Sequence, residues 1–173
     1  MKKYTISLDF LIVLFLTITL FSCSSDDDTS IGQNNSSNKI DFDGETYEIS
    51  GGNFEDGGNN GYSIALFPKG ITFNDSTNII NGGNWFLEID PLITDDNTIE
   101  GKYKCGETVF GYFINNAQFV DDALQPGKIV HKVNQNGTLN ITKLGSEYEF
   151  IYNAFDSSGV AFTAYYKGTL KLL

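Results

Sequence analysis

The last third of the chain carries the pattern that most restricts its fold. Three stretches, 138–144, 147–155 and 160–172, are rich in aromatic and β-branched residues and are separated by short turns of Gly, Ser and Asp. Within the last stretch apolar and polar residues alternate, which directs one face toward a core and the other toward water. A helix has a period of 3.6 residues and does not produce this alternation. The pattern predicts a C-terminal antiparallel meander of three strands.

The preceding residues continue the same pattern. Asp43-Gly44 separates two alternating stretches and predicts a hairpin, because Gly readily adopts the positive φ of a tight turn. Asn136-Gly137 is expected to form another turn, the Gly- and Asn-rich stretch 51–61 a loop, and residues 120–124 one short helical turn. We therefore predict an all-β fold, a single antiparallel β-sandwich or flattened barrel of about nine or ten strands with the meander at its C-terminus.

The N-terminal segment has the features of a secretory signal. Two Lys follow Met1, and the run 10–21 is apolar except for two Thr. Twelve residues rise only about 18 Å as a helix, whereas a bilayer core is roughly 30 Å thick, so the run indicates a signal peptide and not a membrane span. We expect residues 1–22 to be the signal peptide, 23–38 a flexible acidic linker, and 39–173 one folded domain.

Residues 20–23, Leu-Phe-Ser-Cys, resemble the bacterial lipobox. In that motif Leu stands three positions before the cysteine and a small residue immediately before it. The resemblance implies that Cys23 is acylated and becomes the mature N-terminus, so that its lipid holds the protein to a membrane. A plain secretory signal with an incidental cysteine is the alternative.

An acidic stretch follows the cysteine directly and resembles the export signal of surface lipoproteins of the Bacteroidota. It consists of Ser24, Ser25, Asp26, Asp27 and Asp28. The resemblance implies an outer-membrane, lipid-anchored protein that faces the cell exterior. A solvated tether on a protein at the periplasmic face is the alternative. The remainder resembles small β-rich lipoprotein domains of unknown function from the same phylum, through Asp43-Gly44, Gly101-Lys102-Tyr103 and the closing meander.

The charge of the chain argues against nucleic acid as a partner. The formal net charge is −11, and without residues 1–22 it becomes −12, since 9 Lys then stand against 21 acidic residues. Such a field repels polyanions. All eleven basic residues are Lys, so the planar fork with which Arg binds phosphate is missing. We expect no nucleic-acid partner.

The predicted domain offers few groups for catalysis. His131 is the only histidine and no Gly-x-Ser-x-Gly motif is present, which favours a structural or surface histidine over a general base. Cys105 is expected to be a small buried residue. Glu88, Glu147 and Glu149 occupy positions opposite the apolar face of their strands, so solvated carboxylates are favoured over a glycosidase pair. No metal or cofactor is expected.

Other polar and aromatic residues are weighed as binding groups. Trp85 shares the apolar face of its strand and is expected in the core, whereas Tyr165 lies on a polar face and is the better candidate for a glycan platform. Asp95-Asp96-Asn97 and Glu55-Asp56 offer oxygen ligands for calcium but lack the spacing of a calcium loop. Asp75-Ser76-Thr77 resembles an O-glycosylation acceptor of secreted Bacteroidota proteins, with a plain turn as the alternative.

The lipobox-like segment and the acidic stretch, together with a domain poor in catalytic groups, predict a function. We expect a non-enzymatic surface lipoprotein that acts as an interaction or accessory module, with a glycan or a protein at the cell surface as its partner. A barrel-type binder of a small apolar ligand or a glycan-binding module is the alternative. A glycan-active enzyme is the least favoured hypothesis.

Overall fold

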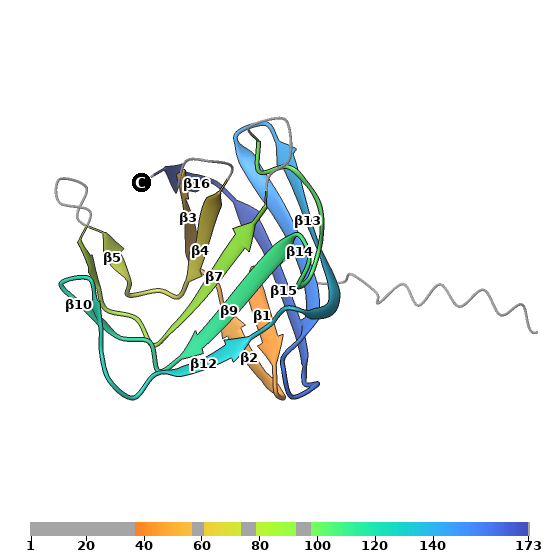
Figure 1. The fold of residues 1–173 in the computed structure, drawn as a ribbon. Coiled ribbons are helices and arrows are strands. Elements are labelled where there is room, and N and C mark those ends of the chain that lie inside the picture. Colours follow the sequence, from red (N-terminus) through yellow and green to blue (C-terminus); the bar gives the residue numbers. More distant parts are fainter. Residues whose placement is uncertain (1–36, 57–60, 74–78, 93–97, 173) are drawn as a thin grey trace, which may run out of the picture. The chain divides into compact units, whose positions relative to one another are not determined.

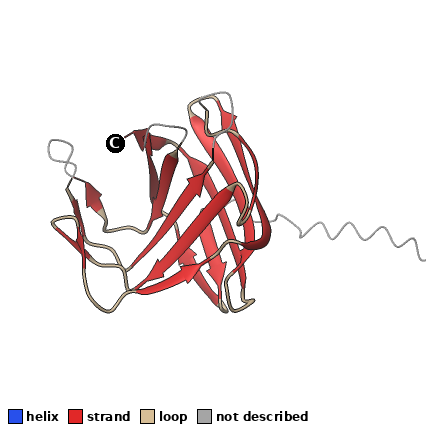
Figure 2. Cartoon of the chain, viewed as in Figure 1, coloured by secondary structure: helices blue, strands red, loops and turns tan. Residues whose placement is uncertain are grey.

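Sixteen strands and no helix make up the part of the chain that the structure describes (Figure 2). The computed structural model describes residues 37–56, 61–73, 79–92 and 98–172. They belong to one unit, Ser36–Leu173. The prediction of an all-β fold is confirmed for these residues. The strand count exceeds the expected nine or ten partly because four strands are only two residues long.

Twelve of the strands form two six-stranded sheets. In spatial order, the first sheet contains β2 (Glu45–Glu48), β1 (Lys39–Phe42), β15 (Ala161–Gly168), β14 (Glu147–Phe155), β13 (Gln135–Leu144) and β8 (Gly101–Lys104). The second sheet contains β12 (Ile129–Lys132), β9 (Val109–Asn115), β7 (Trp85–Pro91), β4 (Tyr62–Phe67), β3 (Gly51–Asp56) and β16 (Leu170–Leu172). Each sheet has an edge strand on both sides, and each edge strand pairs with only one other strand. Neither sheet therefore closes on itself.

Two predicted turn-and-strand units are present as expected. β13 pairs with β14 and β14 with β15, in both cases antiparallel, which confirms the C-terminal meander. β1 and β2 form the hairpin around Asp43 and Gly44, whose φ values of 51° and 79° are those of a tight turn that matches the strand twist.

Asn136-Gly137 is not the predicted turn. The two residues lie inside β13, where the pairing with β14 shifts between Gln135 and Thr138 and forms a β-bulge. Asn136 has a φ of 46°, and a Cβ on Gly137 would overlap the carbonyl oxygen of Asn153. The dipeptide therefore adopts the backbone conformation of a bulge within a strand. The bulge lies near the start of β13, where the chain has passed from β12 in the second sheet to the first sheet.

The last predicted strand divides between the two sheets. β15 ends at Gly168 in the first sheet, and β16 pairs in parallel with β3 in the second. The hydroxyl of Tyr166 donates a hydrogen bond of 2.8 Å to the carbonyl of Thr169, and a Cβ on Gly168 would lie 2.7 Å from that hydroxyl oxygen. Gly168 therefore lets the chain bend tightly around Tyr166.

The stretch predicted as a loop, 51–61, contains strand β3. β3 lies between β4 and β16, and its pairing with β4 runs from Gly51 to Asp56. A Cβ on Gly52 would stand 2.7 Å from the side chains of Leu66 and Leu170. The glycine is thus required by close packing within the sheet, which composition alone does not distinguish from a loop.

Two short hairpin-like pairs complete the fold. β5 (Thr72–Phe73) pairs with β6 (Ile80–Asn81), and β10 (Phe119–Val120) pairs with β11 (Ala123–Leu124). The predicted helical turn at 120–124 is wrong, because Asp121 and Asp122 have φ values of 48° and 65°, which reverse the chain as a hairpin. In Figure 1, β5 and β10 lie on the side of the second sheet away from β14 and β15.

The inner faces of the two sheets share one hydrophobic core. Phe113 of β9 packs against Phe42 of β1 and Phe162 of β15, with ring centroids 5.5 and 5.8 Å apart. Trp85 is buried in this core, as its position on the apolar face predicted. Alternation then directs the neighbouring residues of β7 and β9 to the outer face of the second sheet.

Candidate functional site

The outer face of the second sheet carries a row of residues that are far apart in the sequence. Ala65 of β4 lies opposite Asn53 of β3 on one side and opposite Glu88 of β7 on the other. Glu55 and Ser63 form the next pair along β3 and β4. These side chains point away from the core because their neighbours on the same strands point into it. The row forms the floor of a pocket.

An apolar wall rises beside this floor. Its residues come from β6, β10 and β11, namely Ile80, Phe119 and Leu124. The ring of Phe119 meets that of Phe86 on β7 edge to face, with centroids 5.3 Å apart. Because the wall belongs to segments inserted between sheet strands, the pocket has one side built from the sheet and another from these short hairpins.

Backbone hydrogen bonds hold the wall in position. Gly82 and Phe119 exchange two bonds of 2.9 Å between their amides and carbonyls. The amide of Ile80 donates to a carboxylate oxygen of Asp122, and the amide of Asp121 donates to Oδ1 of Asn81 over 2.9 Å. Segments forty residues apart are thereby tied together, so the wall is a preformed part of the pocket.

The resulting cavity, called the Asn53 pocket below, has a volume of about 240 Å³. Its floor is Asn53, Glu55, Ser63, Ala65 and Glu88, and its walls include Ile80, Phe86, Ile114, Phe119 and Leu124. Ligand pockets typically combine such apolar walls with a few convergent polar groups. The volume lies below the range of about 300–1,000 Å³ for drug-sized ligands, so the pocket suits a single ring or the end of a chain.

Asn53 is the least satisfied polar residue of this pocket. The side chain is 2% exposed, and its Nδ2 donates no hydrogen bond to any atom of the described residues. A buried donor without an acceptor costs about 1–3 kcal/mol, and such groups are rare in folded proteins. The amide is therefore a donor whose hydrogen-bonding capacity is unused within the described residues.

Two carboxylates on β7 lie in a partly desolvated environment. Burial raises the pKa of Glu88, and the nearby charge of Asp90 raises it further. Burial also raises the pKa of Asp90, while a hydrogen bond from Ser63 opposes that rise. The expectation that Glu88 is a solvated carboxylate is therefore wrong. Its strand face was predicted correctly, but hairpins from elsewhere in the chain cover that face.

Replacement of Glu88 by Gln should stabilise the protein at neutral pH. Because the folded state raises the pKa of this carboxyl, it holds the proton more tightly than the unfolded chain does. Ionisation therefore reduces the stability of the folded state as the pH rises above the ordinary value of 4.5. Thermal unfolding should show Glu88→Gln melting above wild type at pH 7, with the gap closing as the pH falls through 4.5.

The control for this measurement is Glu48→Gln on β2. Glu48 is exposed, so the substitution removes the same charge outside the pocket. An equal change of melting temperature in both variants across the pH range would contradict the effect assigned to burial of Glu88.

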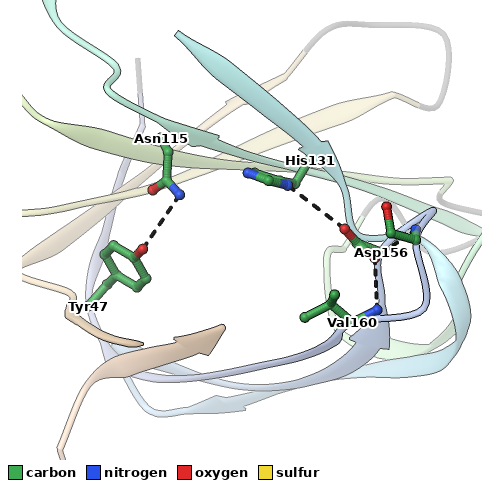
Figure 3. A network of polar contacts seen from close by, with 6 residues as sticks. Tyr47, Asn115, His131, Asp156 and Val160 are labelled. Atoms are coloured by element: carbon green, nitrogen blue, oxygen red, sulfur yellow. Dashed lines mark hydrogen bonds and ion pairs between the residues drawn. The ribbon is translucent and has the colours of Figure 1, made fainter. Parts of the chain in front are cut away.

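His131 has structural contacts. Its Nδ1 lies 3.8 Å from Oδ2 of Asp156 (Figure 3). The centroid of its ring lies 4.8 Å from that of the Phe42 ring. The other oxygen of Asp156 accepts hydrogen bonds of 2.8 and 2.9 Å from the amides of Ser158 and Val160. This network connects the β14–β15 turn with strand β12.

A second cross-sheet contact lies in the same view. Nδ2 of Asn115 on β9 donates to the hydroxyl of Tyr47 on β2 over 3.5 Å (Figure 3). It joins β9 of the second sheet to β2 of the first, and neither this pair nor the His131–Asp156 pair borders the Asn53 pocket.

The remaining predicted residues are dispersed. Cys105 is buried, as expected, and burial raises the pKa of its thiol, which disfavours the reactive thiolate. Tyr165 is partly exposed, and its hydroxyl donates to Oε1 of Glu149 over 2.9 Å. Glu147 is exposed at the start of β14. Of the suggested calcium ligands, Glu55 borders the Asn53 pocket.

Several predictions concern residues outside the described ranges. These are Cys23, the acidic stretch 24–28, Asp75-Ser76-Thr77 and Asp95-Asp96-Asn97, and they stay predictions. Within the described residues there is no helix of the length and hydrophobicity that a bilayer crossing requires.

No protein family model, curated protein or solved structure matches this chain. The assignment of a function to the pocket therefore rests on its own geometry and chemistry. Sequence reasoning missed Asn53 because the residue lies in a stretch predicted as a loop. The signal that could have found it is the Asn-x-Glu alternation of β3, which matches the Ser-x-Ala alternation of β4 opposite.

Proposed function

We propose that this protein is an outer-membrane surface lipoprotein, anchored through lipid on Cys23, whose β-sandwich domain is a non-enzymatic binding module. The Asn53 pocket is its ligand site. The observation that carries this proposal is the buried amide of Asn53, which lacks an acceptor inside a preformed pocket. Such unsatisfied groups are rare in native proteins, and a bound ligand would supply the missing acceptor. The acidic stretch 24–28 supports display of this module to the cell exterior.

An apolar ligand fits this pocket less well than a polar one. It would leave the Asn53 amide without an acceptor and would bury the Glu88 carboxylate further. Of the two alternative binding functions, the pocket therefore supports the one in which the ligand itself forms hydrogen bonds.

A glycan-active enzyme is the second candidate, because Glu88 and Asp90 are neighbouring carboxylates with raised pKa values. Glycoside hydrolysis uses two carboxyl groups that flank the scissile bond. Glu88 and Asp90 stand two residues apart on the same face of one strand and approach a ligand from the same side. This arrangement supports binding over hydrolysis. Release of reducing sugar by wild type, and its loss in Glu88→Gln, would favour the enzyme.

The anchoring part of the proposal predicts complete loss of lipid in Cys23→Ala. Cells fed an alkyne analogue of palmitate should label the wild-type protein, and the variant should carry no label, because Cys23 supplies the thiol and the amino group that are acylated. Without the lipid there is no membrane anchor. The incorporated alkyne lipid is coupled to a fluorescent azide and is measured in the protein band after gel electrophoresis. Cys105→Ala is the matched control and should label like wild type. Equal labelling of wild type and Cys23→Ala would contradict the proposed attachment of lipid to Cys23.

The binding part predicts that filling the pocket abolishes ligand capture. Ala65 lies in the middle of the floor between Asn53 and Glu88, so Ala65→Phe places a ring in the cavity. Ala161→Phe makes the same change at an exposed position on the outer face of the first sheet and should leave binding intact. Binding of the full chain to intact surface polysaccharide and protein preparations is the readout. Equal binding by the two variants would contradict the assignment of the site.

A further inference from the structure

The groups that line the Asn53 pocket restrict the chemical class of its ligand, given the proposed function of this pocket as a binding site. The floor includes Asn53, whose Nδ2 is a buried donor without an acceptor, the hydroxyl of Ser63, and acceptors on the carboxylates of Glu55 and Glu88. The wall offers the rings of Phe86 and Phe119. A complementary ligand must accept a hydrogen bond, donate others, and present an apolar face, all within about 240 Å³.

Charge excludes an anion. The charged side chains that line the pocket, Glu55 and Glu88, are both acidic, and the whole chain carries a net charge of −11. A carboxylate or sulfate would accept from Asn53 but would be repelled by Glu88 at short range. The acceptor on the ligand is therefore a neutral oxygen.

A simple cation satisfies only half of the site. An alkylammonium group would pair with Glu88 but has no acceptor for Nδ2 of Asn53, which would then stay buried and unsatisfied. A hydroxyl group, in contrast, both donates and accepts. Several hydroxyls on one ring would serve the amide and the carboxylates at once, and the C–H face of that ring would pack against Phe86 and Phe119.

We infer that the Asn53 pocket binds one ring of a neutral glycan. Nδ2 of Asn53 donates to an oxygen of the ring, Glu88 accepts from one of its hydroxyls, and the aromatic wall contacts its apolar face. The amide reaches the ligand by rotation about the Cβ–Cγ bond of Asn53, a torsion with broad energy minima. The small volume restricts the site to a single ring, so recognition concerns a terminal sugar or one unit of a chain.

Titration calorimetry on the full-length protein in detergent tests this inference. The probes are cellotriose, maltotriose and mannotriose as neutral glycans, trigalacturonic acid as the acidic counterpart, and hexylamine as a cation. At least one neutral trisaccharide should bind, and trigalacturonic acid should bind at least about tenfold more weakly because of its charge. Asn53→Asp preserves the size of the side chain but replaces the donor with a carboxylate, and should weaken neutral binding about tenfold.

The variants at Ala65 and Ala161 test the location of the binding site separately from the class of ligand that it binds. Neutral binding that is lost in Ala65→Phe and kept in Ala161→Phe supports both the site and the ligand class. Binding of the acid or the amine with the same dependence on Ala65 overturns the neutral glycan and leaves the pocket as a binding site. Neutral binding that survives Ala65→Phe overturns the proposed site itself. Absence of binding by all three neutral probes overturns the ligand class. Circular dichroism confirms that each variant is folded.

Discussion

Replacing Phe113 with alanine should lower the free energy of unfolding by about 3–5 kcal/mol. The side chain is fully buried and joins the two sheets, because its ring contacts aromatic side chains from both. These are Phe42, Tyr47, Trp85, His131 and Phe162. Truncation removes the apolar surface of the ring and leaves a cavity that the surrounding strands cannot close, since their backbones are fixed by pairing.

The loss is large relative to the total stability of about 5–15 kcal/mol expected for a domain. Urea unfolding followed by Trp85 fluorescence measures it. Phe155→Ala removes the same ring from the outer face of β14, where Phe155 is 40% exposed, and should change the stability by no more than about 0.5 kcal/mol. Similar losses in the two variants would contradict a core centred on Phe113.

Gly111→Ala should destabilise the protein by about 1–3 kcal/mol, and its effect should be less than additive with that of Tyr152→Phe. A Cβ on Gly111 would overlap the hydroxyl oxygen of Tyr152 and lie 3.0 Å from a ring carbon. Tyr152 is fully buried, and its hydroxyl donates to the carbonyl of Val133, so the ring has no free space into which it can move. Inserting one methyl group into such a core costs about 1–3 kcal/mol.

The test is a double-mutant cycle measured by urea unfolding. Tyr152→Phe alone should cost about 1–3 kcal/mol, because the carbonyl of Val133 loses its buried donor. In the double variant the overlap with the hydroxyl is gone, so the combined loss should be smaller than the sum of the two single losses. Additive losses would show that Gly111 is required for a reason other than the position of the Tyr152 hydroxyl.

The sequence predicted those elements whose signal is local. The C-terminal meander and the turn at Asp43-Gly44 were predicted from patterns of adjacent residues, and both appear as expected. Trp85 and Cys105 were placed in the core from the face of the strand on which they lie, and both are buried. Residue alternation is a property of the strand itself, so it survives whatever the strand pairs with.

The errors concern positions where a distant part of the chain decides the local structure. Gly51 and Gly52 are typical of loops, yet they lie in β3, which pairs with β4 and β16, and Leu66 and Leu170 leave no space for a Cβ at Gly52. The Asn136-Gly137 dipeptide is typical of a turn, yet it forms a bulge because Asn153 approaches Gly137 closely. In each case another strand approaches so closely that only glycine fits. Amino-acid composition does not reveal which strand approaches.

The candidate site was less predictable than the fold. Asn53, Ala65, Glu88 and Phe119 come from four separate strands, and no motif in the sequence connects them. Glu88 was assigned correctly to the outer face of its strand. Its raised pKa depends on burial, which the strand pattern does not reveal. Neighbouring strands and the hairpins of β6, β10 and β11 supply that environment.

The sequence by itself determined that the described residues form mainly strands, because apolar alternation and turn residues act over a few positions. It also carries the lipobox-like segment and the acidic stretch, whose roles as linear signals stay predictions. Only the tertiary structure decided which strands are neighbours, and therefore which polar groups meet. Pairing brought Asn53 beside Ala65 and Glu88 and left its amide buried without an acceptor. A binding pocket is a property of that pairing, since hydrogen bonding and desolvation depend on distances that only the folded chain sets.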